Sequence, residues 1–270
     1  MSNTILFVFE GEILEGNIFN NIKDTFFSTP ESATTIKYSF CAEIFQLWNN
    51  VKDDPDLDIL EVLKERPDSD IDNLTRKDVS EVHLFFDHDA HSRPEETQEE
   101  YNLKINNLLE TFNNEFERGK LWISYPMAEA IKHCKTKPEN CFKDSTINIS
   151  EYKNYKNLVN ENSDFKNIKE YDENTWFYLT NINIQRVFCL INNSYKEITG
   201  YNEINEWFED NAIITKIIHE KQFDKFIKPK NEVVALSPFP LFLLYHFGES
   251  FFNNCKKDER IKTCSFFCYQ

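Results

Sequence analysis

The sequence predicts an α/β fold, in which helices flank a mostly parallel sheet and a mainly helical C-terminal extension follows. Three observations support this fold class. Short apolar runs alternate with segments of helical periodicity in the first half of the chain, which is typical of parallel sheets. Two of these runs, Ile5–Phe9 and Leu84–Phe86, end directly at acidic residues. Beyond about residue 145, Asn, Lys and Tyr dominate and helical patterns prevail.

Each expected element follows from its local pattern of apolar residues and of residues that end helices and strands. In chain order they are a strand at 4–9, a helix at 12–27, a strand at 34–40, a helix at 42–51, a strand at 82–86, a strand at 121–123 and a helix that begins at 127–132. The acidic stretch 53–78 contains two prolines and predicts a surface insertion with a short helix at 57–64.

A long helix is expected from Pro94 to about Arg118. Proline suits the first turn of a helix, because backbone nitrogens there have no hydrogen-bond partner within the helix and the missing N–H of proline costs nothing. Glu95 and Glu96 then lie near the positive end of the helix dipole. Gly119 is the expected residue at the C-terminal end of this helix.

The change in composition near residue 145 predicts an α/β domain over residues 1–145 and a helical extension over residues 146–270. Helices of the extension are expected at 182–189, 204–208, 213–226 and 240–251. The apolar run 233–247 is interrupted by Ser, Pro and His and is too short to cross a bilayer. We expect it to belong to the core, or to form a surface for a second copy of the chain or another partner.

Composition excludes several classes of function. The chain has 270 residues and only five glycines, without a G-x-G-x-x-G or P-loop pattern, so a glycine-rich nucleotide loop is not expected. The formal net charge of −16 opposes non-specific binding of nucleic acid. If the protein acts on nucleic acid, metal ions must reverse the local charge or a partner must deliver the substrate.

The compartment is predicted from the N-terminus and the cysteines. The first nine residues lack the basic start of a signal peptide, and together with the short apolar runs this predicts a cytoplasmic protein that does not bind membranes. The seven cysteines are scattered and odd in number. Reduced thiols are therefore expected.

Acidic residues at strand ends carry the functional hypothesis. Asp87 and Asp89 follow a buried strand, and side chains two apart share a face of an extended chain. Glu10 follows another apolar strand. Paired carboxylates are the ligands that Mg²⁺ and Mn²⁺ prefer, so the sequence predicts a metal site at the edge of the sheet.

The order of these elements resembles the Toprim fold, the Rossmann-like catalytic domain of type IA topoisomerases, primases and OLD-type nucleases. Three motifs carry the resemblance: Phe9-Glu10-Gly11 with Glu15, Phe86-Asp87-His88-Asp89, and Ser124-Tyr125-Pro126-Met127-Ala128-Glu129. They are most similar to those of small Toprim proteins such as RloB and the AriB effector of the PARIS system, which defend bacteria against phages. The resemblance covers about residues 4–135.

The resemblance implies a role for each matching residue. Glu10, Asp87, Asp89 and Glu129 are the expected catalytic acids, and Glu10, Asp87, Asp89 and Glu15 the expected ligands of Mg²⁺ or Mn²⁺. It implies a nuclease that cleaves RNA, tRNA or DNA and that a partner ATPase controls, with a homodimer as a further possibility. No basic residue matches a motif that would place it at the substrate phosphate.

Two other functions fit the same residues. In a haloacid-dehalogenase-like phosphatase Asp87 would be the nucleophile and Asp89 the acid–base, although such a fold begins with this strand. A Toprim-like scaffold that binds partners without catalysis is the other. Asp-x-Asp can also be a solvated loop or a helix N-cap, and Glu15 can be a first-turn acid favoured by the helix dipole. His88 and His91 read as loop histidines that are usually exposed.

Overall fold

The computed structural model describes residues 4–28, 34–41, 44–54, 57–65, 71–88, 96–136, 143–194, 196–209 and 213–257. Contacts between residues divide the chain into two units. The first unit comprises residues 1–86 and 103–122, and the second comprises residues 87–102 and 123–270. The expected boundary near residue 145 stays a prediction.

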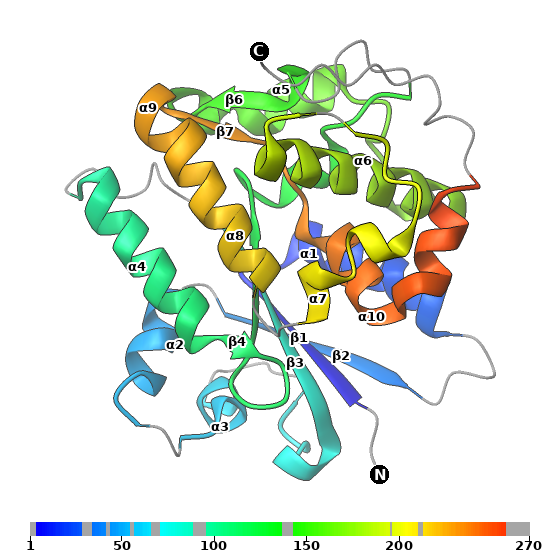
Figure 1. Cartoon of the computed structure of the whole chain (residues 1–270). Helices are drawn as coiled ribbons and strands as arrows, with labels where there is room; N and C mark the ends of the chain where they lie inside the picture. The colour runs from blue at the N-terminus through cyan, green and yellow to red at the C-terminus, as the bar shows by residue number, and fades with distance from the viewer. Residues whose placement is uncertain are drawn as a thin grey trace. The chain divides into compact units, whose positions relative to one another are not determined.

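A five-stranded sheet, in the order β2-β1-β3-β5-β4, forms the centre of the α/β part (Figure 1). Its strands are β1 (Thr4–Phe9), β2 (Thr35–Phe40), β3 (Val79–Asp87), β4 (Asn113–Asn114) and β5 (Gly119–Ser124). The interior strand β1 pairs in parallel with both β2 and β3, whereas β4 pairs antiparallel with β5. Every residue of β1 is buried, as expected for a strand covered on both faces. The expected mostly parallel α/β sheet is thus confirmed.

The helices of the first half lie where the apolar periodicity predicts them. They are α1 (Ile13–Ile22) with a π-helical turn at Lys23–Phe27, α2 (Ile44–Val51), α3 (Ile59–Lys64) and a 3₁₀ turn at Arg76–Asp78. The side chain of Asp58 caps α3 by accepting a hydrogen bond of 3.0 Å from the backbone nitrogen of Leu60.

The stretch expected to be a surface insertion contributes to the core of the first unit. Ile59, Leu60, Leu63 and Ile71 each expose at most 1% of their surface. Acidic and apolar residues are interspersed in this stretch, so its short helix is amphipathic although the stretch as a whole is acidic. Its apolar face is buried because the free energy of transfer from water favours burial.

The long helix expected to reach Arg118 ends earlier. It is α4, Gln98–Thr111, and the chain then turns through β4 into β5. Phe116, which lies within the expected helix, is 57% exposed at the turn. The Asn114 side chain accepts a hydrogen bond from the backbone of Phe116, which stabilises the turn over a further helical one. Gly119 begins β5 with a φ of 98°, so it ends the turn rather than the helix.

The second unit is mainly helical, as expected, and contains a small antiparallel sheet of β6 (Thr146–Asn148) and β7 (Glu232–Val234). Its helices are α5 (Tyr155–Asn162), α6 (Glu173–Asn192), α7 (Glu206–Glu209), α8 (Ile213–Gln222) with a π-helical turn at Phe223–Ile227, α9 (Lys228–Lys230) and α10 (Pro238–Cys255). Helices α6 and α10 pack against each other.

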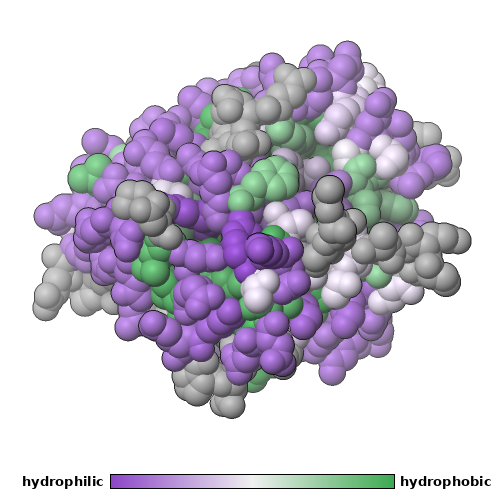
Figure 2. All heavy atoms as spheres, turned by 90° about the horizontal axis from the view of Figure 1, so that it is seen from below, coloured by the Kyte–Doolittle hydropathy of each residue, from purple (hydrophilic) through white to green (hydrophobic). Residues whose placement is uncertain are grey.

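The apolar run near the C-terminus is core for most of its length. Phe242, which we considered as part of a docking surface, is fully buried in α10, while Phe247 is half-buried. The described helices include none that is long and apolar enough to cross a membrane. One face of the protein, shown in Figure 2, consists mostly of hydrophilic side chains with smaller hydrophobic areas between them.

Four cysteines lie in the described residues, and all of them are buried: Cys41, Cys134, Cys189 and Cys255. The expectation of reduced thiols stays a prediction. The remaining three, Cys141, Cys264 and Cys268, lie outside the described residues.

Candidate functional site

Two of the expected acids lie at the carboxyl ends of paired strands. Glu10 directly follows β1, and Asp87 is the last residue of β3. The two strands run parallel side by side, with Phe9 paired to Phe85 (Figure 1). Both acids therefore lie at the same edge of the sheet, and both are partly exposed there. Asp89, the third expected acid, lies outside the described residues.

Glu15 closes the turn between β1 and α1. It lies in the first turn of α1, is only 7% exposed, and its Oε1 accepts a hydrogen bond of 3.1 Å from the backbone nitrogen of Gly11. A Cβ atom on residue 11 would lie 2.7 Å from that oxygen, so any larger residue there requires the Glu15 carboxylate to shift. At least one oxygen of Glu15 thus serves the backbone, and this arrangement fits the interpretation as a first-turn acid.

Glu129 lies in the second unit, on a 3₁₀ helix at Ala128–Lys132 that follows β5 and a cis Tyr125-Pro126 peptide. Its side chain is mostly buried, and its Oε1 lies 3.2 Å from the Nζ of Lys156 on α5. The Lys156 side chain that forms this contact is 66% exposed. The site therefore includes a cation that no motif of the sequence indicated.

A buried tyrosine lies near both Asp87 and Glu129. The hydroxyl of Tyr155 is 3.0 Å from the Nδ1 of His133. Burial raises the pKa of Tyr155 well above its usual value, and the negative charges of Glu129 and Asp87 raise it further, while Arg186 opposes the shift. Asp87 and Glu129 are thus close enough to act electrostatically on one hydroxyl group.

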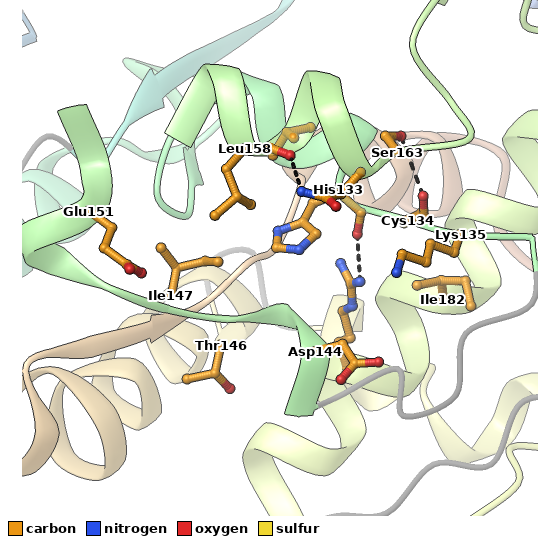
Figure 3. A pocket seen from close by; sticks show the side chains of 13 residues that line it. His133, Cys134, Lys135, Asp144, Thr146, Ile147, Glu151, Leu158, Ser163 and Ile182 are labelled. Atoms are coloured by element: carbon orange, nitrogen blue, oxygen red, sulfur yellow. Dashed lines mark hydrogen bonds between the residues drawn. The ribbon is translucent and has the colours of Figure 1, made fainter. Parts of the chain in front are cut away.

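A cavity of about 360 Å³ opens beside His133 in the second unit (Figure 3). Asp144, Glu151 and Arg186 line it together with His133. Two backbone carbonyls fix the guanidinium group of Arg186, which donates to the oxygen of His133 at 2.7 Å and to that of Ala235 at 3.0 Å. The wall thus carries fixed charges of both signs.

His133 is neutral in this environment. Burial, reinforced by the positive charge of Arg186, lowers its pKa to about 3. The ring then carries one proton at neutral pH, and it can either donate to the Tyr155 hydroxyl or accept from it, according to its tautomer.

His88, expected to be an exposed loop histidine, is buried. It is 1% exposed, and its ring stacks on that of Tyr125 with the centroids 5.0 Å apart. Burial lowers its pKa to about 4, because the charged form would lose its hydration. The reason for the difference is that β3 continues through Asp87 and that the backbone of His88 donates to Ser124 of β5. His91 lies outside the described residues.

Asp87 and Glu129, both in the second unit, offer only carboxylate oxygen, which is the ligand chemistry of a hard divalent cation. The described residues contain no group of three or more His, Cys, Asp or Glu side chains that could hold a metal ion.

Sequence reasoning missed Lys156, Tyr155 and Arg186. All three come from the helical half, which matches no motif, and their roles depend on contacts with residues 20 to 60 positions away in the chain, such as Glu129 and His133. No pattern in the sequence signals such contacts. The chain matches no protein-family model, no curated protein and no solved structure.

Proposed function

We propose that this protein is a nuclease that hydrolyses phosphodiester bonds with the help of Mg²⁺ or Mn²⁺ at the carboxyl edge of its main sheet. The observation that carries the proposal is the parallel pairing of β1 with β3, because Glu10 and Asp87 follow these two strands at one edge. Ligand sites of open α/β sheets lie beyond the carboxyl ends of their strands. The Toprim resemblance names the same two acids.

Each residue has a part in this proposal. Asp87, with Asp89 and Glu10, would hold the metal ion, which supplies charge for the phosphate and lowers the pKa of a bound water. Glu129 forms an ion pair with Lys156, and in this proposal the Lys156 ammonium would bind a phosphate oxygen. Tyr155 keeps its proton because its pKa is raised, so it can donate a hydrogen bond.

The net charge of −16 bears on how the substrate arrives. A free protein of this charge repels nucleic acid at long range, and the repulsion depends on salt. We propose that a partner protein, an ATPase as the family resemblance implies, controls the nuclease in phage defence. The active form is then the chain with metal at the sheet edge.

The test is cleavage of end-labelled tRNA, single-stranded RNA and duplex DNA by the full chain, with Mg²⁺, Mn²⁺ or EDTA. Metal-dependent cleavage is expected, and Glu10→Gln and Asp87→Asn should each lower its rate by about 10²–10⁴, since positioned acid–base and ligand groups contribute that much. Glu12→Gln is the matched control, because Glu12 is exposed in the next turn and should leave the rate unchanged.

Two results would contradict the proposal. Full nuclease activity of the Glu10→Gln protein would contradict the Toprim-like mechanism. Hydrolysis of p-nitrophenyl phosphate that requires Asp87, without cleavage of any nucleic acid, favours the haloacid-dehalogenase-like phosphatase. Absence of both activities in a folded, metal-loaded chain with its partner favours the scaffold.

A further inference from the structure

A second, smaller cavity lies in the second unit next to His88, the residue that follows Asp87. Its volume is about 140 Å³. The walls combine aromatic and aliphatic surface, from Tyr101, Phe223 and Ile227, with side-chain amides at several points. This mixture is typical of sites for planar polar ligands, where apolar walls provide contact area and few polar groups fix orientation.

A buried chain of hydrogen bonds orients one of these amides. The Oδ1 of Asn102 lies 2.9 Å from the Nε2 of His219, and the Nδ1 of His219 lies 3.0 Å from the hydroxyl of Tyr125. Because a carbonyl oxygen only accepts, the Nε2 of His219 donates to Asn102 and the Tyr125 hydroxyl donates to Nδ1. The Nδ2 of Asn102 has no hydrogen-bond partner within the described part of the chain. It is a donor with a fixed direction in the cavity wall.

An acceptor is supplied by Gln98. Its Nε2 donates to the Oδ1 of Asn231 at 3.0 Å, so its own Oε1 remains an acceptor in the wall. A donor from Asn102 and an acceptor from Gln98 on one wall match the edge of a nucleobase, which carries both kinds of group. A purely apolar ligand would leave these amide groups without partners, which is costly.

The charges of the cavity exclude a phosphate group. Its lining, as far as the structure describes it, contains no lysine or arginine, and Glu96 adds a carboxyl group. His219 is neutral at physiological pH, because burial lowers its pKa to about 3. The part of a ligand that enters is therefore uncharged.

Size selects the ligand further. Cavities for drug-sized molecules begin at about 300 Å³, whereas a cavity of about 150 Å³ holds a single benzene ring. We propose that the cavity of about 140 Å³ binds a pyrimidine base, with the sugar and phosphate outside it. This assignment rests on the proposed function. In a nucleic-acid substrate, the bound pyrimidine would be the base directly before or after the phosphate that is cleaved. Free nucleotides and single strands share this chemistry.

The experiment measures binding without cleavage. The full chain in EDTA is titrated with UMP, CMP, AMP, ribose 5-phosphate and a short oligouridylate, by isothermal titration calorimetry. The pyrimidine ligands should bind at least tenfold more tightly than ribose 5-phosphate and more tightly than AMP. Tighter binding of the oligouridylate than of UMP identifies a strand as the source of the base, and equal binding identifies the free nucleotide.

The variants test the geometry. Asn102→Asp keeps the acceptor for His219 but removes the donor, and Gln98→Ala removes the acceptor, so each should weaken UMP binding at least fivefold. Asn192→Asp makes the same chemical change on an exposed part of α6 and should have no effect. Equal binding of UMP and ribose 5-phosphate would overturn the proposal. It would also be overturned if the Asn102→Asp and Gln98→Ala proteins, shown by circular dichroism to be folded, bound UMP as tightly as the wild type.

Failure of this inference is separable from failure of the nuclease proposal. If the Glu10→Gln protein still binds the base in EDTA but no cleavage occurs under any condition, the base-binding proposal is supported and the nuclease proposal is contradicted. If cleavage depends on metal but UMP, AMP and ribose 5-phosphate bind equally well, only the assignment of the cavity to a pyrimidine base is contradicted.

Discussion

The turn from β1 into α1 depends on two residues that must fit each other. The Glu15 carboxylate accepts a hydrogen bond from the Gly11 nitrogen at 3.1 Å, and it occupies the space that a side chain on residue 11 would need. Because Glu15 is only 7% exposed, it has little room to move away. The sequence left two interpretations of this glutamate open, a metal ligand and a first-turn acid, and the structure gives it a structural contact.

We expect Gly11→Ala to lower the free energy of unfolding by about 1–3 kcal/mol, since the buried carboxylate must move and lose its hydrogen bond. In a Glu15→Ala background the same change should cost much less, because the obstructing atoms are gone. Urea unfolding of the two single variants and the double variant gives the coupling energy. Additive effects of the two substitutions would show that Glu15 does not occupy the space in solution.

At the scale of elements, the most informative difference from expectation is the end of α4 at Thr111. The apolar spacing from Leu103 to Phe116 is helical in the sequence, yet Leu103 is 61% exposed and Phe116 lies at a turn. Periodicity could not locate this end, because β5 must reverse direction to pair with β4, and that requirement is not local.

Two glycines of these elements should respond in opposite ways to alanine. Gly119 has a φ of 98°, and a Cβ atom there would lie 3.2 Å from the Val82 side chain, so Gly119→Ala should destabilise by about 1–3 kcal/mol. Gly16 lies inside α1 with open space around it, so Gly16→Ala should stabilise by about 0.5–1 kcal/mol. Thermal and urea unfolding measure both. Equal signs for the two substitutions would contradict the described geometry.

At the scale of the whole molecule, buried histidines connect stability to pH. The folded pKa values of His88 and His219 are about 4 and about 3, below the unfolded value of about 6.5. Unfolding therefore takes up protons when the pH lies between these values. The stabilisation is complete above about pH 6.5 and is lost as the pH falls toward the folded pKa values.

We expect the free energy of unfolding to fall between pH 6.5 and 4 with an uptake approaching three protons, about 1.4 kcal/mol per pH unit for each, because burial also lowers the pKa of His133 to about 3. Urea unfolding at a series of pH values measures the slope. His219→Gln should reduce the uptake by about one proton. A free energy that stays constant over this range would contradict the neutral state of these rings.

The sequence by itself determined the α/β class, the strands at both ends of the first half and the acids that follow them, because these depend on local periodicity and on which residues a buried strand tolerates. Glu10 and Asp87 could be named in advance for that reason. Only the tertiary structure decided that Lys156 meets Glu129, that His88 is buried and that Asn102 is oriented through His219. These contacts join residues up to 117 positions apart, and their formation depends on how whole helices pack, which no local pattern encodes.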